Sequence, residues 1–241
     1  MEQASNDNEL ARLLGISHSF KTSKTLNLSA KLGIYTLLHE HPGGLSWKDI
    51  ADRIALKKKD AFRGVSDFLD LLVSIRTLER HGNDPNTARY TKHPTAAAFL
   101  VQTSEDYCGG VMKLNNDRSY ALLECLEDSL KTGEVPPDTS ERIPNILTVF
   151  GAQGTQQAAE RSCPSVSQHF SEAMMGASIG NFRKLAKVFP FSKYQSLGDF
   201  GGSNGRVSQC LRVFGAPAEC TIVATTYDLP LVVKGAKPSY V

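Results

Sequence analysis

The sequence lacks a long apolar run, a paired cysteine motif and an excess of charge of either sign. No apolar stretch approaches the ~18 residues that a membrane helix needs, and the N-terminal segment has neither the basic nor the apolar region of a secretory signal. We therefore expect a soluble, cytoplasmic protein without a membrane partner. Because 27 Lys and Arg stand against 25 Asp and Glu, composition does not indicate nucleic acid or an acidic substrate.

The five cysteines are odd in number, widely spaced and free of any C-x-x-C pair. That pattern fits neither a zinc knuckle nor a disulfide framework. Isolated cysteines of this kind are mostly buried packing residues. We expect reduced thiols and no metal site.

The first hundred residues have the apolar spacing of helices and a strand pair. Residues 1–25 are expected to form a helical arm, and residues 26–40 a separate helix that ends at the segment HPGG. Ser46 is placed to cap a third helix. A fourth helix over residues 60–75 has inward-facing apolar positions, which are Phe62, Val65, Phe68, Leu69, Leu72 and Val73. Two short strands around an Asn/Asp/Pro turn complete a winged helix-turn-helix.

A winged helix raises the question of DNA binding. Residues 46–93 hold ten Lys and Arg and seven acids, a small positive excess. The expected outward face of the fourth helix, however, carries Asp60, Arg63, Asp67 and Asp70. Because DNA phosphates would repel three carboxylates, we expect residues 1–100 to form a packing or dimerisation domain without a nucleic-acid partner. DNA binding is the least favoured alternative.

Residues 101–190 are expected to be mostly helical, as a linker followed by substrate-pocket helices. Leu122, Leu126 and Leu130 lie in register on a helix that Gly133 ends. Prolines predict a loop after it. Two helices are expected over residues 166–189, with a break near Gly176 to Gly180.

The segment LGDFGGSNG, residues 197–205, runs from an apolar stretch into a cluster of glycines. We expect a strand before the cluster, a helix after it over 206–214, and a second strand that ends before Asp228. This order is the first half of a Rossmann-type nucleotide site, placed in residues 191–241. A glycine turn without a ligand is the alternative.

The details of the loop indicate which ligand it suits. Its glycines do not have the G-x-G-x-x-G spacing of a dinucleotide site. Asp199, directly before the loop, favours a ligand with an ammonium group over a pyrophosphate. Both observations point to S-adenosylmethionine.

Six separated segments carry a resemblance, and they are LSAKLGIYTLLHEHPGGLSWKDIADRIAL, YTKHPTAAAFLV, SLKTGE, FSEAMMGASIGNF, LGDFGGSNGR and YDLPLVV. Over residues 26–234 the chain resembles the S-adenosylmethionine-dependent O-methyltransferases of the caffeate/hydroxyindole type, especially fungal members acting on aromatic natural products. The resemblance implies a mainly α winged-helix dimerisation domain followed by the start of an α/β Rossmann-like methyltransferase domain. It also implies a homodimer formed through the N-terminal domain, S-adenosylmethionine as cofactor, and methyl transfer to a hydroxyl of a small aromatic or polyketide-type metabolite.

The family motifs carry over residue by residue. Positions that match cofactor-binding residues are Ser178, Asp199, Gly201, Gly202, Gly205 and Asp228, with Asp228 matching the ribose-binding acid. Ser203 stands where the family loop has a further glycine. Positions that match the acceptor pocket are Phe170, Met174 and Ala177, for which the alternative is the buried face of a helix.

In the family, a histidine downstream of the second half of the sheet is the general base. All six histidines of this sequence precede the glycine loop, so no catalytic residue is assigned. Three interpretations stay open. The sequence is a truncated form of an ordinary methyltransferase, a short relative that no longer methylates and acts as a dimer partner, or a catalyst of a cofactor-free cyclisation or dehydration.

Overall fold

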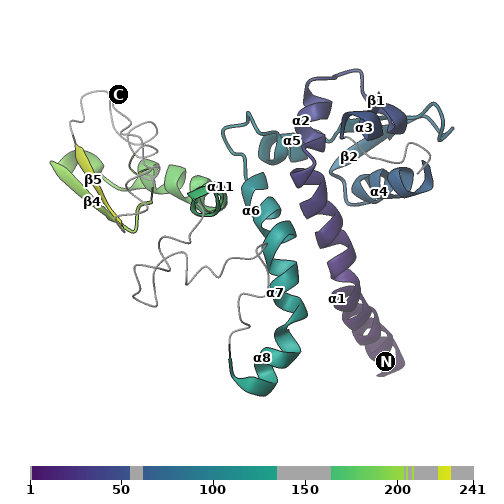
Figure 1. The fold of residues 1–241 in the computed structure, drawn as a ribbon, viewed down its shortest axis with the longest axis horizontal. Coiled ribbons are helices and arrows are strands. Elements are labelled where there is room, and N and C mark those ends of the chain that lie inside the picture. The colour runs from purple at the N-terminus through teal and green to yellow at the C-terminus, as the bar shows by residue number, and fades with distance from the viewer. Residues whose placement is uncertain are drawn as a thin grey trace. The chain divides into compact units, whose positions relative to one another are not determined.

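A computed structural model of the chain describes residues 2–54, 62–134, 164–203, 205, 208 and 222–228, except for the side chains of residues 2–7, 62 and 164–172. The chain divides into two compact units, Met1–Asn116 and Asp117–Val241. Figure 1 shows the elements of each unit, and each is described by itself.

The first unit begins with a long helix, α1 (Glu2–Lys31), and a short one, α2 (Ile34–His39). Gly33 separates them with a left-handed φ of 69°, a conformation that costs other residues about 1–2 kcal/mol. Its N–H donates to the carbonyl of Ala30. The expected boundary between residues 25 and 26 is therefore wrong, because the arm runs on to Lys31 and the break lies at Gly33.

The two helices that follow are α3 (Trp47–Arg53) and α4 (Phe62–Ser74). Ser46 caps α3 as predicted. Its Oγ accepts a hydrogen bond from the Asp49 N–H, while the Asp49 carboxylate accepts one from the Ser46 N–H, both at 3.2 Å. This reciprocal arrangement is a capping box, which satisfies backbone donors that a helix start leaves unpaired.

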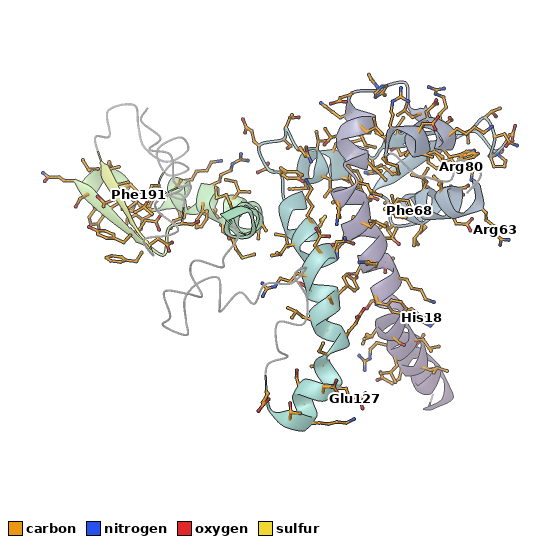
Figure 2. The ribbon with its side chains drawn as sticks, in the orientation of Figure 1. His18, Arg63, Phe68, Arg80, Glu127 and Phe191 are labelled. Carbon is orange, nitrogen blue, oxygen red and sulfur yellow. The ribbon has the colours of Figure 1, made fainter. Side chains whose placement is uncertain are left out.

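One face of α4 enters the core of the first unit. Val65, Leu69 and Leu72 are buried on it, as their spacing predicts. Figure 2 shows Phe68 on the side of α4 that faces α1, and Arg63 projecting away from the helix. The core also takes residues from α2, α3, β3 and the end of α5, among them Ile34, Tyr35, Leu38, Trp47, Ile50, Tyr90 and Leu100.

A three-stranded antiparallel sheet forms the wing, in the order β1 (Leu45–Ser46), β3 (Arg89–Lys92), β2 (Leu78–His81). The hairpin of β2 and β3 was predicted. Strand β1 was not, because two residues are too few to show the alternation of apolar and polar side chains that is typical of a strand. The Arg89 guanidinium fastens the wing by donating to the carbonyl oxygens of Gly43 (2.9 Å) and Gly44 (2.6 Å). The helices and this sheet confirm the winged-helix prediction.

The remaining helices of the first unit are α5 (Pro94–Leu100) and α6 (Gly109–Leu114), and α6 packs against α1. A π-helical turn, η1 (Asn115–Ser119), follows. In the second unit, α7 (Tyr120–Glu124) and α8 (Leu126–Thr132) replace the single predicted helix, because the backbone at Cys125 leaves helical geometry. Gly133 ends α8 as predicted, with a φ of 71°.

The second unit continues with α11 (Pro164–Val188), which passes through Gly176 and Gly180 without interruption. The expected break there is wrong; a glycine inside a helix costs only about 1 kcal/mol. After a 3-10 turn, η2 (Phe191–Lys193), come β4 (Ser196–Phe200) and β5 (Val223–Tyr227), which pair in parallel. Phe191 packs with Ala186 and Ile222 in a small core beside these strands (Figure 2).

No helix in the described ranges is long and apolar enough to cross a membrane. Cys108 and Cys125 are free thiols, and the other three cysteines lie outside the described residues. The same holds for most of the loop predicted after Gly133 and, apart from Ser208, for the helix predicted over 206–214.

Candidate functional site

The glycine loop begins where β4 ends, at the carboxyl end of the parallel pair. The Gly201 N–H donates to the carbonyl of Tyr227, the last residue of β5, at 2.7 Å, and the Gly205 N–H donates to the carbonyl of Gly202 at 2.9 Å. Gly201 and Gly205 both have a φ of 74°. These two positions need glycine because left-handed backbone is unfavourable for residues with a Cβ.

Gly202 needs glycine for a different reason, which is space. A Cβ built there would lie 2.7 Å from the Thr226 Cγ2 and closer still to the carboxylate of Asp199. The backbone of Gly202 thus lies directly against the Asp199 side chain. Such close approach is the usual function of a glycine in a ligand loop.

Two carboxylates stand at this end of the strands. Asp228 follows β5, and its Oδ2 accepts a hydrogen bond from the Ser203 N–H at 2.7 Å. Asp199 is half-buried, and its Oδ2 accepts one from the Ser208 hydroxyl at 3.4 Å. The sequence places the two acids 29 positions apart, and the parallel register brings both to the loop.

The surroundings of Asp199 disfavour its ionised form. Burial raises its pKa above the ordinary value, the hydrogen bond from Ser208 opposes that rise, and the negative charge of Asp228 adds to it. Two neighbouring acids at a glycine loop suit a ligand that carries a cation and hydroxyl groups. In the described part of the chain, no three His, Cys, Asp or Glu side chains gather to hold a metal ion.

The other predicted site residues lie on α11. Ser178 is half-buried, Ala177 is exposed, and Met174 is 39% exposed. The backbone of Phe170 is helical, but its side chain lies outside the described ones. The roles assigned to these four residues stay predictions.

Ser208 and Thr226 were missed as parts of the site. Ser208 is buried beside Asp199, and the Thr226 side chain borders Gly202 and Gly205. The signal for Ser208 was its place three residues after Gly205, in the first turn of the predicted helix. Thr226 shares its strand face with Ala224, so alternation could have placed it toward the loop.

The face of α4 that would meet DNA differs in part from the expectation. Arg63 and Asp67 form an exposed ion pair at 3.6 Å. Asp70 stays partly exposed but is engaged by the wing: its carboxylate accepts hydrogen bonds from the Arg80 guanidinium and from the Tyr90 hydroxyl, each at 2.9 Å. Asp70 therefore joins the helix to the wing. Asp60 lies outside the described residues.

Known proteins are similar to this chain in its N-terminal domain and over most of its sequence. Residues 14–102 match the family model of the O-methyltransferase dimerisation domain. This chain carries an O-methyltransferase dimerisation domain. The predicted relationship to O-methyltransferases is thereby confirmed, while the narrower placement in a fungal branch stays a prediction.

The similarity of this chain to known methyltransferases extends beyond residues 14–102. The chain is 28% identical over 218 residues to the tetracenomycin polyketide synthesis 8-O-methyl transferase TcmO of Streptomyces glaucescens, covering 90% of this chain and 56% of TcmO. It is 27% identical to the N,N-dimethyltransferase OxyT of Streptomyces rimosus with the same coverage of both chains. The chain thus spans just over half the length of these relatives.

A solved structure shows the same fold. The human N-acetylserotonin methyltransferase in complex with SAM superposes with a TM-score of 0.73 at 23% identity, covering 93% of this chain and 61% of that one. The predicted fold class, a helical dimerisation domain followed by a Rossmann-like α/β fold, is confirmed, while the truncation of that second fold stays a prediction.

Proposed function

We propose that this chain binds S-adenosylmethionine at the glycine loop and takes part in methyl transfer to a hydroxyl group of a small aromatic or polyketide-type metabolite. The observation that carries the proposal is the geometry around Gly202. A loop backbone lies against the Asp199 carboxylate while a loop N–H holds Asp228, the acid after the neighbouring strand.

The residues present fit this cofactor. The amino-acid end of S-adenosylmethionine carries an ammonium group, and the charge of that group would relieve the repulsion that Asp228 exerts on Asp199. Asp228 is placed to accept hydrogen bonds from ribose hydroxyls, as acids after the second strand of such units do. The sulfonium methyl of the cofactor supplies the transferred carbon.

The rest of the pocket is assigned to α11. Ser178 would hold the carboxylate of the cofactor, and Phe170, Met174 and Ala177 would face the acceptor. The side chain of Met174 is flexible and apolar, which suits a planar aromatic acceptor. The domain description and the name of TcmO support oxygen as the acceptor atom, whereas the name of OxyT keeps nitrogen as the alternative.

We also propose that the chain forms a homodimer through its N-terminal unit. Between Leu10 and Phe20, α1 exposes apolar side chains, with exposed fractions of 47–58% at Leu10, Leu13, Leu14, Ile16 and Phe20. A group of exposed apolar side chains of this size favours burial against another surface. A second copy of the dimerisation domain supplies such a surface.

A methyl-transfer assay tests the proposal. The chain would be incubated with S-adenosylmethionine labelled on its methyl group and with a panel of hydroxylated aromatic polyketides, beside amine-bearing analogues of the same skeletons. We expect label in the hydroxylated acceptors, lost in Asp228→Asn and kept in the control Asp67→Asn, whose side chain is exposed on α4. Absence of both transfer and cofactor binding would overturn the proposal.

A further inference from the structure

The two acids of the site are held by different kinds of donor. Asp228 is held by a backbone N–H, that of Ser203. Asp199 is held by a side chain, the hydroxyl of Ser208, which is 8% exposed and nine residues away along the chain. A side-chain donor can be removed by substitution without changing the backbone.

The surroundings of Asp199 give this hydroxyl a specific function. The carboxylate lies against the Gly202 backbone, and the Thr226 methyl borders the same space. Among the described residues, Asp228 supplies the charge that acts on Asp199, and that charge is of the same sign. Burial and like charge both disfavour an ionised carboxylate, whereas a donated hydrogen bond favours it and also fixes its direction.

We propose that Ser208 is a positioning residue of the cofactor site, whose hydroxyl orients the Asp199 carboxylate toward the glycine loop and keeps it ionised for a cationic ligand. The ligand part of this inference rests on the proposed function. The contact between Ser208 and Asp199 does not, so the two can be tested separately.

The first test needs no ligand. The pKa of the Asp199 carboxyl would be measured by carbon-detected NMR titration in the wild type, Ser208→Ala, Ser208→Thr and Ser192→Ala, a control with an exposed serine in the same unit. We expect a higher pKa in Ser208→Ala, since its hydroxyl opposes the rise. Ser208→Thr keeps the hydroxyl and should stay close to the wild type, as should the control. An unchanged pKa in Ser208→Ala would overturn the proposal.

The second test measures S-adenosylhomocysteine binding over a range of pH. Loss of a hydrogen bond to a charged group should weaken binding about tenfold in Ser208→Ala, and more so at acid pH, where Asp199 becomes protonated first in that variant. In an Asp199→Asn background the same substitution should have no further effect. Wild-type affinity in Ser208→Ala would refute the positioning function. If the wild type binds no S-adenosylhomocysteine, the proposed function fails, and the NMR titration alone decides on Ser208.

Discussion

Two adjacent glycines in the loop should respond differently to the same substitution. Gly201 has a φ of 74°, and a Cβ there would meet nothing within 4 Å, so Gly201→Ala introduces backbone strain alone. Gly202 has no positive φ, but its Cβ would collide with Thr226 and with the Asp199 carboxylate. Gly202→Ala therefore introduces overpacking beside one of the two acids.

Gly201→Ala and Gly202→Ala should lose similar amounts of unfolding free energy, but they should differ in their affinity for S-adenosylhomocysteine. Left-handed strain lowers the free energy of unfolding by about 1–2 kcal/mol, and overpacking by about 1–3 kcal/mol. The two side chains that this Cβ would contact, Asp199 and Thr226, are short and have few alternative rotamers. The overlap can therefore be removed only if Asp199 or the loop backbone moves. Because that movement disturbs a hydrogen-bonded carboxylate, we expect Gly202→Ala to bind S-adenosylhomocysteine at least about tenfold more weakly than Gly201→Ala.

Urea denaturation and calorimetric titration of the two variants and the wild type would measure both quantities. The substitutions are chemically identical and adjacent, so each variant serves as the control for the other. Equal affinities of Gly201→Ala and Gly202→Ala would refute the reasoning, as would a Gly202→Ala protein as stable as the wild type.

Three further predictions concern the first unit. Ser46→Ala removes the α3 capping box and should lower the free energy of unfolding by about 1 kcal/mol. The Ser46 hydroxyl also donates to the Asp49 carboxylate at 2.7 Å and holds the pKa of Asp49 below its ordinary value. This stabilisation is present above the ordinary pKa and is lost as pH falls through the lowered one, so urea denaturation at neutral and acid pH should show a smaller acid loss in the variant. Tyr90→Phe removes the hydroxyl that donates to Asp70 at 2.9 Å and should cost about 1–2 kcal/mol of unfolding free energy. The control Tyr194→Phe, at a residue that is 51% exposed, should cost nothing measurable in the same denaturation assay. Leu13→Asp places a charge on the exposed apolar face of α1 and should raise the dissociation constant of the dimer on the order of a hundredfold, measured by analytical ultracentrifugation; an unchanged constant would place the interface elsewhere.

The strand, loop and acids of the site could be predicted from sequence because each has a local signal. The short apolar run that starts at Leu197 indicates a strand, and the glycine cluster indicates a turn with backbone that other residues avoid. Parallel pairing then brings Asp199 and Asp228 to one end of the strands. The distance between the acids in sequence is no obstacle, because strand direction alone determines which ends meet.

Tertiary contacts decided the features that sequence could not predict. Asp70 is polar and lies on a helix, so periodicity places it outward, but Arg80 and Tyr90 on the wing give its carboxylate hydrogen-bond partners that the spacing does not reveal. Ser208 has no distinguishing motif, and its part in the site appears only when Asp199 lies beside it.

Glycines in this chain have two opposite effects on helices, and the sequence alone does not indicate which effect a given glycine has. Gly33 interrupts a helix through its left-handed φ, whereas Gly176 and Gly180 are carried inside α11. The cost of a glycine within a helix is small enough for the packing of a 25-residue helix to override it. The predicted break at 176–180 failed for this reason.

The central claim is that the loop and its two acids bind S-adenosylmethionine. The most direct measurement is an equilibrium titration of the 241-residue chain with S-adenosylhomocysteine, repeated on Asp199→Asn, Asp228→Asn and the exposed control Asp67→Asn. The account predicts saturable binding by the wild type and the control, and weaker binding by both site variants. Absence of binding by the wild type, or equal binding by all four proteins, would contradict it.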